Sequence, residues 1–309
     1  MRRFRLAGGP IPGTIGAFRN GSSLMSSTSQ PEPGSVRYLL AGAFHRMAYV
    51  SWGDPAAPVV VCVHGLTRNG RDFDVLAEAL ADRFHVICPD LPGRGGSDWL
   101  PDPMLYQAQH YAVALGHLLA AIGRDVAWVG TSLGGICGIL LAAAGNSPIN
   151  RLVLNDIGSF IPSAALARIR DYLASDTAPT RFADLSALER HLREIHAPFG
   201  ALTDAQWAAL ARSSARALPD GGFAMHYDPA IATVIRAQPP VDVDLTPFYS
   251  RIRTPILAIR GADSDLLLPE TLALMRSAGA ETLEIPGAGH APALMDPFQT
   301  DAVRRFLLG

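Results

Sequence analysis

Short apolar runs alternate with longer stretches of helical periodicity along most of the chain. The apolar runs are rich in Val, Ile and Leu and contain few polar residues, which is typical of strands that are covered on both faces of a sheet. They lie at residues 58–64, 85–89, 125–130, 151–156, 255–261 and 281–286. We therefore predict a buried strand at each of these places.

Helical patterns fill most of the gaps between the apolar runs. In residues 72–82 the apolar positions 73, 76, 77 and 80 lie on one face of a helix. Similar patterns predict helices at residues 104–122, 133–144, 269–279 and 297–308. Strands that alternate with helices indicate the α/β class, with a doubly wound, mostly parallel sheet. Residues 38–52 predict an antiparallel hairpin at its edge.

Residues 158–249 interrupt this alternation. They predict helices but contain no convincing buried strand, and Thr203 to Gln206 (TDAQ) matches a capping box. The predicted helices of this stretch are residues 164–173, 186–196 and 203–218. We expect an all-helical insertion that forms a lid over the carboxyl edge of the sheet, where open α/β sheets bind ligands. The α/β core that carries the sheet would then comprise residues 35–157 and 250–309.

The first 34 residues differ in composition from the rest of the chain. They are rich in Gly, Pro and Ser, carry arginines at positions 2, 3, 5 and 19, and contain no acidic residue before Glu32. An arginine-rich segment of this kind is either a disordered tail or a leader peptide. Glycines and prolines between positions 8 and 13 interrupt the apolar stretch that a signal sequence needs. We expect a disordered tail that can be removed without loss of the protein's activity.

Composition narrows the class of protein. Of the 309 residues, 49% are hydrophobic and 17% are charged, which excludes an intrinsically disordered chain. The net charge of -2 provides no basic excess for nucleic acid or an anionic membrane. No uncharged apolar stretch reaches the roughly 18 to 20 residues of a membrane-spanning helix. The cysteines at positions 62, 88 and 137 are widely spaced. They predict buried free thiols and a cytoplasmic location rather than disulfides or a zinc site.

A candidate nucleophile lies between a predicted strand and a predicted helix. Residues 130–134 read GTSLG, a GxSxG pattern in which a sharp strand-to-helix turn raises the hydroxyl of Ser132 above the sheet. The flanking glycines permit the tight turn, and the N–H groups of the helix start favour a developing negative charge. An ordinary glycine-rich turn is the structural alternative, but the context favours catalysis by Ser132.

A serine hydroxyl needs a base, and a histidine base needs a carboxylate that orients it. Among the nine histidines, His290 lies in a glycine-rich loop after the last predicted strand, from which it can reach Ser132. Asp263 and Asp265 follow the strand at 255–260. Asp156 follows the strand before it. The alternation of residues does not separate Asp263 from Asp265, so all three carboxylates remain candidates on this ground.

Two further groups of residues are assigned to the predicted site. The backbone N–H groups of Leu66 and Leu133 are expected to form an oxyanion hole, whereas His64 is expected to shape the loop. Large aromatic residues either line the substrate pocket or pack the insertion onto the core. These are Trp99, Phe160 and Trp207, together with Phe199 and Phe223.

The order and spacing of these motifs resemble the α/β-hydrolase family from about residue 37 to the end of the chain. The shared segments are HG at 64–65, DLPGRGGS at 90–97, GTSLGG at 130–135, GADSDLLLP at 261–269 and GAGH at 287–290. The resemblance implies Asp265 as the acid, because the family's acid usually lies four residues before the proline that opens the next helix. It is closest to the lid-bearing serine hydrolases. The family's epoxide and dehalogenating hydrolases have an aspartate where Ser132 stands.

Together these features predict a serine hydrolase that uses Ser132, His290 and Asp265. We expect it to cleave carboxylic esters of small or medium apolar substrates through an acyl-enzyme, with a small-molecule ester as its partner and with no metal or organic cofactor. Two alternatives remain. A C–C bond hydrolase that acts on meta-cleavage products would use the same triad, and a non-enzymatic ligand receptor would use the same fold.

Overall fold

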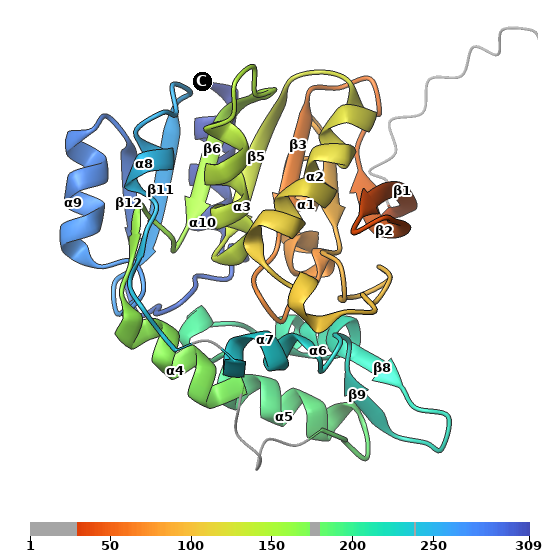
Figure 1. Ribbon diagram of the computed structural model, residues 1–309. Helices are drawn as coiled ribbons and strands as arrows, with labels where there is room; N and C mark the ends of the chain where they lie inside the picture. Colours follow the sequence, from red (N-terminus) through yellow and green to blue (C-terminus); the bar gives the residue numbers. More distant parts are fainter. Residues whose placement is uncertain (1–29, 174–179, 238) are drawn as a thin grey trace, which may run out of the picture.

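A single eight-stranded sheet forms the centre of the molecule (Figure 1), and its strand order is β1-β2-β4-β3-β5-β6-β11-β12. The computed structural model describes residues 30–173, 180–237 and 239–309. The strands are β1 (Glu32–Leu40), β2 (Ala43–Trp52), β3 (Val59–Val63), β4 (His85–Pro89), β5 (Val126–Thr131), β6 (Ile149–Asn155), β11 (Ile256–Gly261) and β12 (Glu281–Ile285). The hairpin β1–β2 and the pair β2–β4 are antiparallel, and all other neighbours are parallel. The predicted mostly parallel sheet is confirmed.

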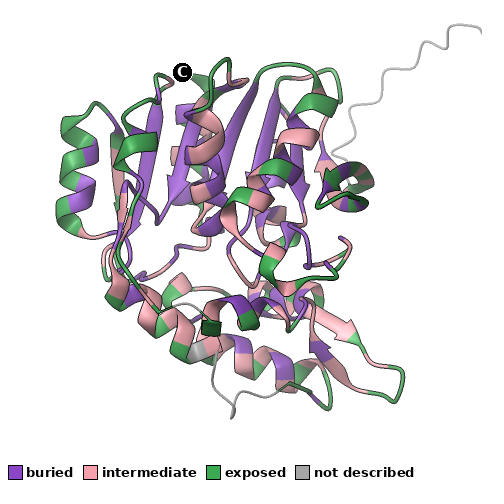
Figure 2. Ribbon diagram, in the orientation of Figure 1, coloured by how far each residue is buried: buried purple, intermediate pink, exposed green. Residues whose placement is uncertain are grey.

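Helices cover both faces of the sheet, because alternate residues of each central strand point in opposite directions. On β3, Val59, Val61 and Val63 pack with residues of α2 and α3. Val60 and Cys62 pack on the opposite face with residues of α1 and α10. Figure 2 shows that the central strands are almost entirely buried. The covering helices are α1 (Asp74–Leu80), α2 (Ala108–Ile122), α3 (Leu133–Ala142), α9 (Pro269–Ser277) and α10 (Pro297–Leu308).

The stretch inserted between β6 and β11 lies at one end of the sheet in Figure 1, and we call residues 158–249 the inserted segment. Its helices are α4 (Ser163–Leu173), α5 (Leu185–Ile195), α6 (Asp204–Ser214), α7 (Ile231–Ala237) and α8 (Thr246–Tyr249). The predicted capping box at Thr203 and Gln206 is present at the start of α6. The prediction of an all-helical insertion is wrong. Two short antiparallel ladders accompany the helices, β7 (Phe160–Ile161) with β10 (Val243–Asp244) and β8 (Ala215–Ala217) with β9 (Phe223–Met225).

The central sheet includes residues before position 35. Strand β1 starts at Glu32, and Glu32, Pro33 and Gly34 already pair with β2. A side chain at Gly34 would collide with the ring of Tyr49, so this end of the strand is closely packed. Residues 1–29 of the predicted tail lie outside the described residues.

Two predictions from composition can be compared with the structure. Cys62, Cys88 and Cys137 are buried free thiols, as expected. Burial in apolar surroundings raises the pKa of Cys137 to about 12, so its thiol stays protonated. In the described ranges no helix is both long enough and apolar enough to span a membrane.

Candidate active site

Ser132 lies in a strained turn between β5 and α3. Its φ of 51° and ψ of -114° are unusual for a residue with a side chain. The N–H of Ser132 donates to the carbonyl of Asn155, 3.0 Å away, which ties the turn to β6. A side chain at Gly134 would collide with the carbonyl oxygen of Val63, and one at Gly130 with the backbone at Gly134. The glycines of the GxSxG pattern therefore let α3 begin directly against the sheet.

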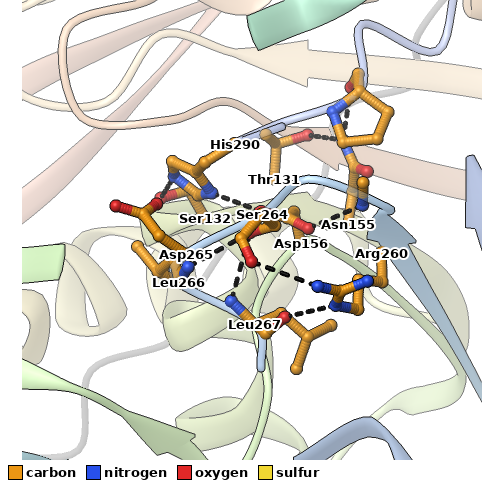
Figure 3. Close-up of polar contacts among 12 residues, drawn as sticks. Thr131, Ser132, Asn155, Asp156, Arg260, Ser264, Asp265, Leu266, Leu267 and His290 are labelled. Atoms are coloured by element: carbon orange, nitrogen blue, oxygen red, sulfur yellow. Dashed lines mark hydrogen bonds and ion pairs between the residues drawn. The ribbon is translucent and has the colours of Figure 1, made fainter. Parts of the chain in front are cut away.

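His290 connects the serine to a buried carboxylate (Figure 3). Its Nε2 lies 2.9 Å from Oγ of Ser132, and its Nδ1 lies 2.6 Å from Oδ2 of Asp156. The loop that carries His290 packs against the inserted segment, because the N–H of Gly289 donates to the carbonyl of Pro198 at 2.8 Å. A serine, a histidine and an aspartate in hydrogen-bond contact form the arrangement that activates a serine nucleophile.

The carboxylate is that of Asp156, which follows β6, and the prediction that Asp265 contacts His290 is wrong. Asp156 has a φ of 54°, and it is fully buried. Besides His290, its Oδ1 accepts a hydrogen bond from the N–H of Gly261 at 2.9 Å, and its Oδ2 accepts one from the hydroxyl of Ser264 at 2.5 Å. These donors compensate for removing the carboxylate from water.

The direction of the loop after β11 explains why Asp265 does not reach His290. Ser264 points inward to Asp156, whereas its neighbours Asp263 and Asp265 are exposed. Asp265 instead forms a two-pronged ion pair with Arg168 of α4, with N–O distances of 2.5 and 2.8 Å. Partial burial alone would raise the pKa of Asp265, but the hydrogen bonds and charge of Arg168 outweigh burial and lower it.

The loop proposed to hold an oxyanion is fixed by buried side chains. The Nδ1–H of His64 donates to the carbonyl of Gly65 at 2.7 Å, and its Nε2 accepts from the N–H of Leu91 at 2.9 Å. Burial lowers the pKa of His64 to about 3, so His64 is neutral and acts in the loop as expected. The Nε of the buried Arg94 donates to the carbonyl of Leu66 at 2.8 Å. Among the described residues, the N–H groups of Leu66 and Leu133 have no acceptor.

A cavity of about 220 Å³ opens at Ser132 and His290. Its core side includes Gly65 and Leu66, and its other side belongs to the inserted segment. The lining residues from that segment are Arg168, Ile169, Leu173, Ile195, His196, Phe199 and Leu210. The pocket therefore lies at the junction between the sheet and the inserted segment.

Most of the aromatic residues predicted to line the pocket lie elsewhere. Only Phe199 does so, and Trp99, Phe160 and Trp207 do not, nor does Phe223. Trp207 packs in the apolar cluster of the inserted segment. Trp99 is 43% exposed and stacks with the guanidinium of Arg216. Aromatic character alone therefore did not identify the pocket wall.

Sequence reasoning found Ser132 and His290 but did not assign three other polar residues to the pocket, His196, Arg68 and Arg168. His196 is buried and stacks on Phe199 with a ring separation of 4.5 Å. Its burial, together with the charge of Arg68, lowers its pKa well below the ordinary value and keeps it neutral. Arg68 and Arg168 also reach the pocket. They come from a loop and a helix without a recognisable motif, so no pattern marked them. Within the described ranges, no group of three or more His, Cys, Asp or Glu residues is arranged to hold a metal ion.

Comparisons with known proteins agree with this fold. The model of the "Alpha/beta hydrolase family" matches residues 60–304. A 3-hydroxybutyrate-oligomer hydrolase from Cupriavidus necator is 40% identical over 294 residues, which cover 91% of this chain and 99% of the relative. A pimeloyl-[acyl-carrier protein] methyl ester esterase from Xanthomonas campestris is 30% identical, over 81% of this chain and 95% of that protein.

Solved structures lead to the same assignment. A putative hydrolase from Rickettsia typhi superposes with a TM-score of 0.82 at 32% identity, and the match covers 91% of this chain and 99% of that one. An alpha/beta hydrolase from Novosphingobium aromaticivorans superposes with a TM-score of 0.80 at 35% identity, with the same coverage of both chains. From the family match, the relatives and the fold, we conclude that this chain belongs to the alpha/beta hydrolase family.

Proposed function

We propose that this protein is a serine hydrolase of carboxylic esters, with Ser132 as nucleophile, His290 as base and Asp156 as the acid that orients His290. The observation that carries the proposal is the continuous contact from Oγ of Ser132 through His290 to the buried carboxylate of Asp156. A carboxylate on Nδ1 fixes the tautomer in which Nε2 accepts the proton of the serine. It also stabilises the imidazolium that then forms.

The reaction follows from this geometry. Ser132 Oγ attacks the ester carbonyl while its proton passes to Nε2 of His290. The N–H groups of Leu66 and Leu133 stabilise the oxyanion, a contribution of roughly 3 kcal/mol per donor. His290 then gives the proton to the leaving alkoxide, and an acyl-enzyme remains. Water, deprotonated by His290, attacks the acyl-enzyme and releases the acid and Ser132.

Names of the relatives support ester chemistry and suggest a first substrate. The relative with 40% identity is named for hydrolysis of 3-hydroxybutyrate oligomers, which are chains joined by ester bonds. Another is named as a methyl ester esterase. We therefore propose short oligoesters of 3-hydroxy acids as the substrate class to test first. We also propose that the inserted segment acts as a lid, since it provides much of the pocket wall.

Two measurements test this function. A fluorophosphonate probe should label the wild type but not Ser132→Ala, because the probe reacts with an activated serine. A panel of p-nitrophenyl esters, a 3-hydroxybutyrate dimer, an amide and a vinylogous diketone should show preference for the esters. Labelling that persists in Ser132→Ala would place the nucleophile elsewhere. Turnover of the diketone alone would favour a C–C hydrolase.

A further inference from the structure

The inserted segment places one arginine on the wall of the pocket with hydrogen-bond donors still available. Arg168 lies on α4 and lines the same cavity as Ser132 and His290. Its side chain is 49% exposed, so its guanidinium is accessible to solvent and to a bound molecule. It is not needed for the contacts of the triad, which are made by residues of the core.

Asp265 orients this guanidinium without exhausting its donors. A guanidinium has five N–H donors in a rigid plane. Asp265 accepts from Nε at 2.5 Å and from Nη2 at 2.8 Å. Among the described residues, Nη1 has no acceptor. The edge formed by Nη1 and the second N–H of Nη2 matches the geometry of a carboxylate. Because the pKa of Asp265 is lowered, the ion pair persists at neutral pH.

The other arginine of the pocket is already committed to the protein. Arg68 is 5% exposed, and its Nε and Nη2 donate to Asp72 at 2.8 and 2.7 Å. Its Nη1 donates to the hydroxyl of Ser214 at 2.9 Å. His196 is neutral at physiological pH because its pKa is low. Among the described residues that line the pocket, Arg168 is therefore the cation best placed to bind an anion.

The rest of the wall contributed by the inserted segment is largely apolar and includes Ile169, Leu173, Ile195, Phe199 and Leu210. Apolar walls that surround a small number of oriented polar groups are typical of sites that fix a ligand's orientation. The wall fits an apolar chain that ends in an anionic group.

We propose, resting on the ester hydrolase activity proposed above, that Arg168 binds a free carboxylate of the substrate and makes the enzyme selective for anionic esters. Short oligomers of 3-hydroxy acids belong to this class, because each keeps one free carboxylate. Arg168 acts as a specificity-determining residue, and Asp265 holds it in place. The carboxyl group that the family resemblance assigned to catalysis thus serves recognition.

Two matched substrate pairs test the assignment. The first pair is the 3-hydroxybutyrate dimer and its terminal carboxamide, and the free carboxylate of the dimer lies on the alcohol side of the single ester bond. The second pair is mono-p-nitrophenyl glutarate and p-nitrophenyl valerate, in which it lies on the acyl side. We expect Arg168→Gln to lower the ratio of kcat/KM for the anionic member to that for the neutral member by about 10- to 100-fold in at least one pair. The value for the neutral member should change less than about threefold.

Arg170→Gln is the control, because Arg170 lies on the same helix, pairs with Asp171 and does not line the pocket. This variant should keep the wild-type ratio. Equal losses for both members of a pair, or an unchanged ratio in both pairs, would overturn the role of Arg168. The fluorophosphonate labelling rate of Ser132 checks that the variant is folded. A wild type without Ser132-dependent hydrolysis of any ester would instead contradict the proposed function, and this inference with it.

Discussion

The carboxylate of Asp156 forms hydrogen bonds with two separate segments of the chain, one of which carries His290. It accepts hydrogen bonds from Gly261 at the end of β11, from Ser264 of the loop that follows, and from His290 of the loop after β12. A fully buried carboxylate that loses such partners is costly, so the three contacts depend on one another. The residue therefore links the position of the histidine to the ends of two strands.

Exchanging Asp156 for its amide tests this residue. In Asp156→Asn, the amide NH₂ can take the place of an oxygen that accepts from His290, which favours the wrong tautomer of the ring. We expect kcat on a neutral p-nitrophenyl ester to fall by about 10³- to 10⁴-fold. Asp265→Asn, the matched control, should lower it by less than about tenfold. A greater loss in Asp265→Asn would return the acid to the position that the family resemblance implied.

Buried neutral histidines give a second prediction at the residue scale. Burial lowers the pKa values of both His64 and His196, to about 3 for His64, whereas both titrate near 6.5 in an unfolded chain. Below about pH 6.5 the unfolded chain therefore binds more protons than the folded one. The stability that these groups contribute is present above that pH and is lost as the pH falls. Each histidine lowers the free energy of unfolding by up to about 1.4 kcal/mol for each unit by which the pH falls below 6.5.

Urea unfolding between pH 7 and pH 5 measures this effect. The free energy of unfolding of the wild type should fall with decreasing pH, and His196→Gln should show a shallower slope because one of the two groups is removed. The comparison uses the slope and not the absolute stability, since the substitution also removes the stacking on Phe199. An identical slope in the two proteins would contradict this prediction, because it would show that the pKa of His196 is the same in the folded and unfolded states.

At the scale of elements, apolar periodicity was sufficient to predict the core. The runs at 58–64 and 85–89 became β3 and β4 within one residue at each end, because buried strands need continuous apolar sequence. The ladders β7–β10 and β8–β9 were not predicted. Their strands have only two or three residues, too few for a period to be recognised.

The candidate site could be predicted only in part. Ser132 and His290 lie in glycine-containing motifs at strand ends, and the structure brings them into contact. The choice among the acids depended on which way the loop after β11 turns. The inward residue there is Ser264, and an alternating pattern fixes only the relative orientation of neighbours. The pocket wall depended on contacts across the inserted segment, which leave no local pattern.

The close packing of α3 against the sheet predicts opposite effects of the same substitution at two glycines, one in α2 and one in α3. In an open helix, Gly→Ala is stabilising by up to about 1 kcal/mol. Gly116 in α2 has no atom within 4 Å of the added methyl group, so Gly116→Ala should stabilise the protein. Gly134→Ala, which places the methyl group against the carbonyl of Val63, should destabilise it by about 1 to 3 kcal/mol or more. Urea unfolding measures both, and a stabilising Gly134→Ala would contradict the close approach of α3 and β3.

On the scale of the whole molecule, the chemical groups and the pocket wall come from different parts of the chain. Ser132, Asp156 and His290 all follow strands of the central sheet. The inserted segment has its own apolar cluster, which includes Leu188, Trp207 and Met295, the last from the loop after β12. This cluster fixes the segment against the loop of His290. The wall of the pocket can therefore vary while the triad keeps its geometry.

A pair of isoleucines in the inserted segment tests this division of roles. Ile169 of α4 lines the pocket, whereas Ile235 of α7 packs against the core and does not line it. Ile169→Ala should enlarge the pocket and shift the ratio of kcat/KM for bulky over short neutral esters by about 10-fold or more, equivalent to roughly 1 to 3 kcal/mol of changed contact. Ile235→Ala removes the same atoms and should leave this ratio unchanged, even where it lowers the melting temperature.

Fluorophosphonate labelling of Ser132 separates specificity from chemistry in these variants. Because the triad and the proposed oxyanion donors lie outside the inserted segment, the labelling rate should stay within about threefold of the wild type in both. If Ile169→Ala slowed the labelling and the turnover of every ester by the same factor, the inserted segment would support the catalytic groups themselves. The measured pattern of rates therefore decides whether residues 158–249 select the substrate or hold the triad in place.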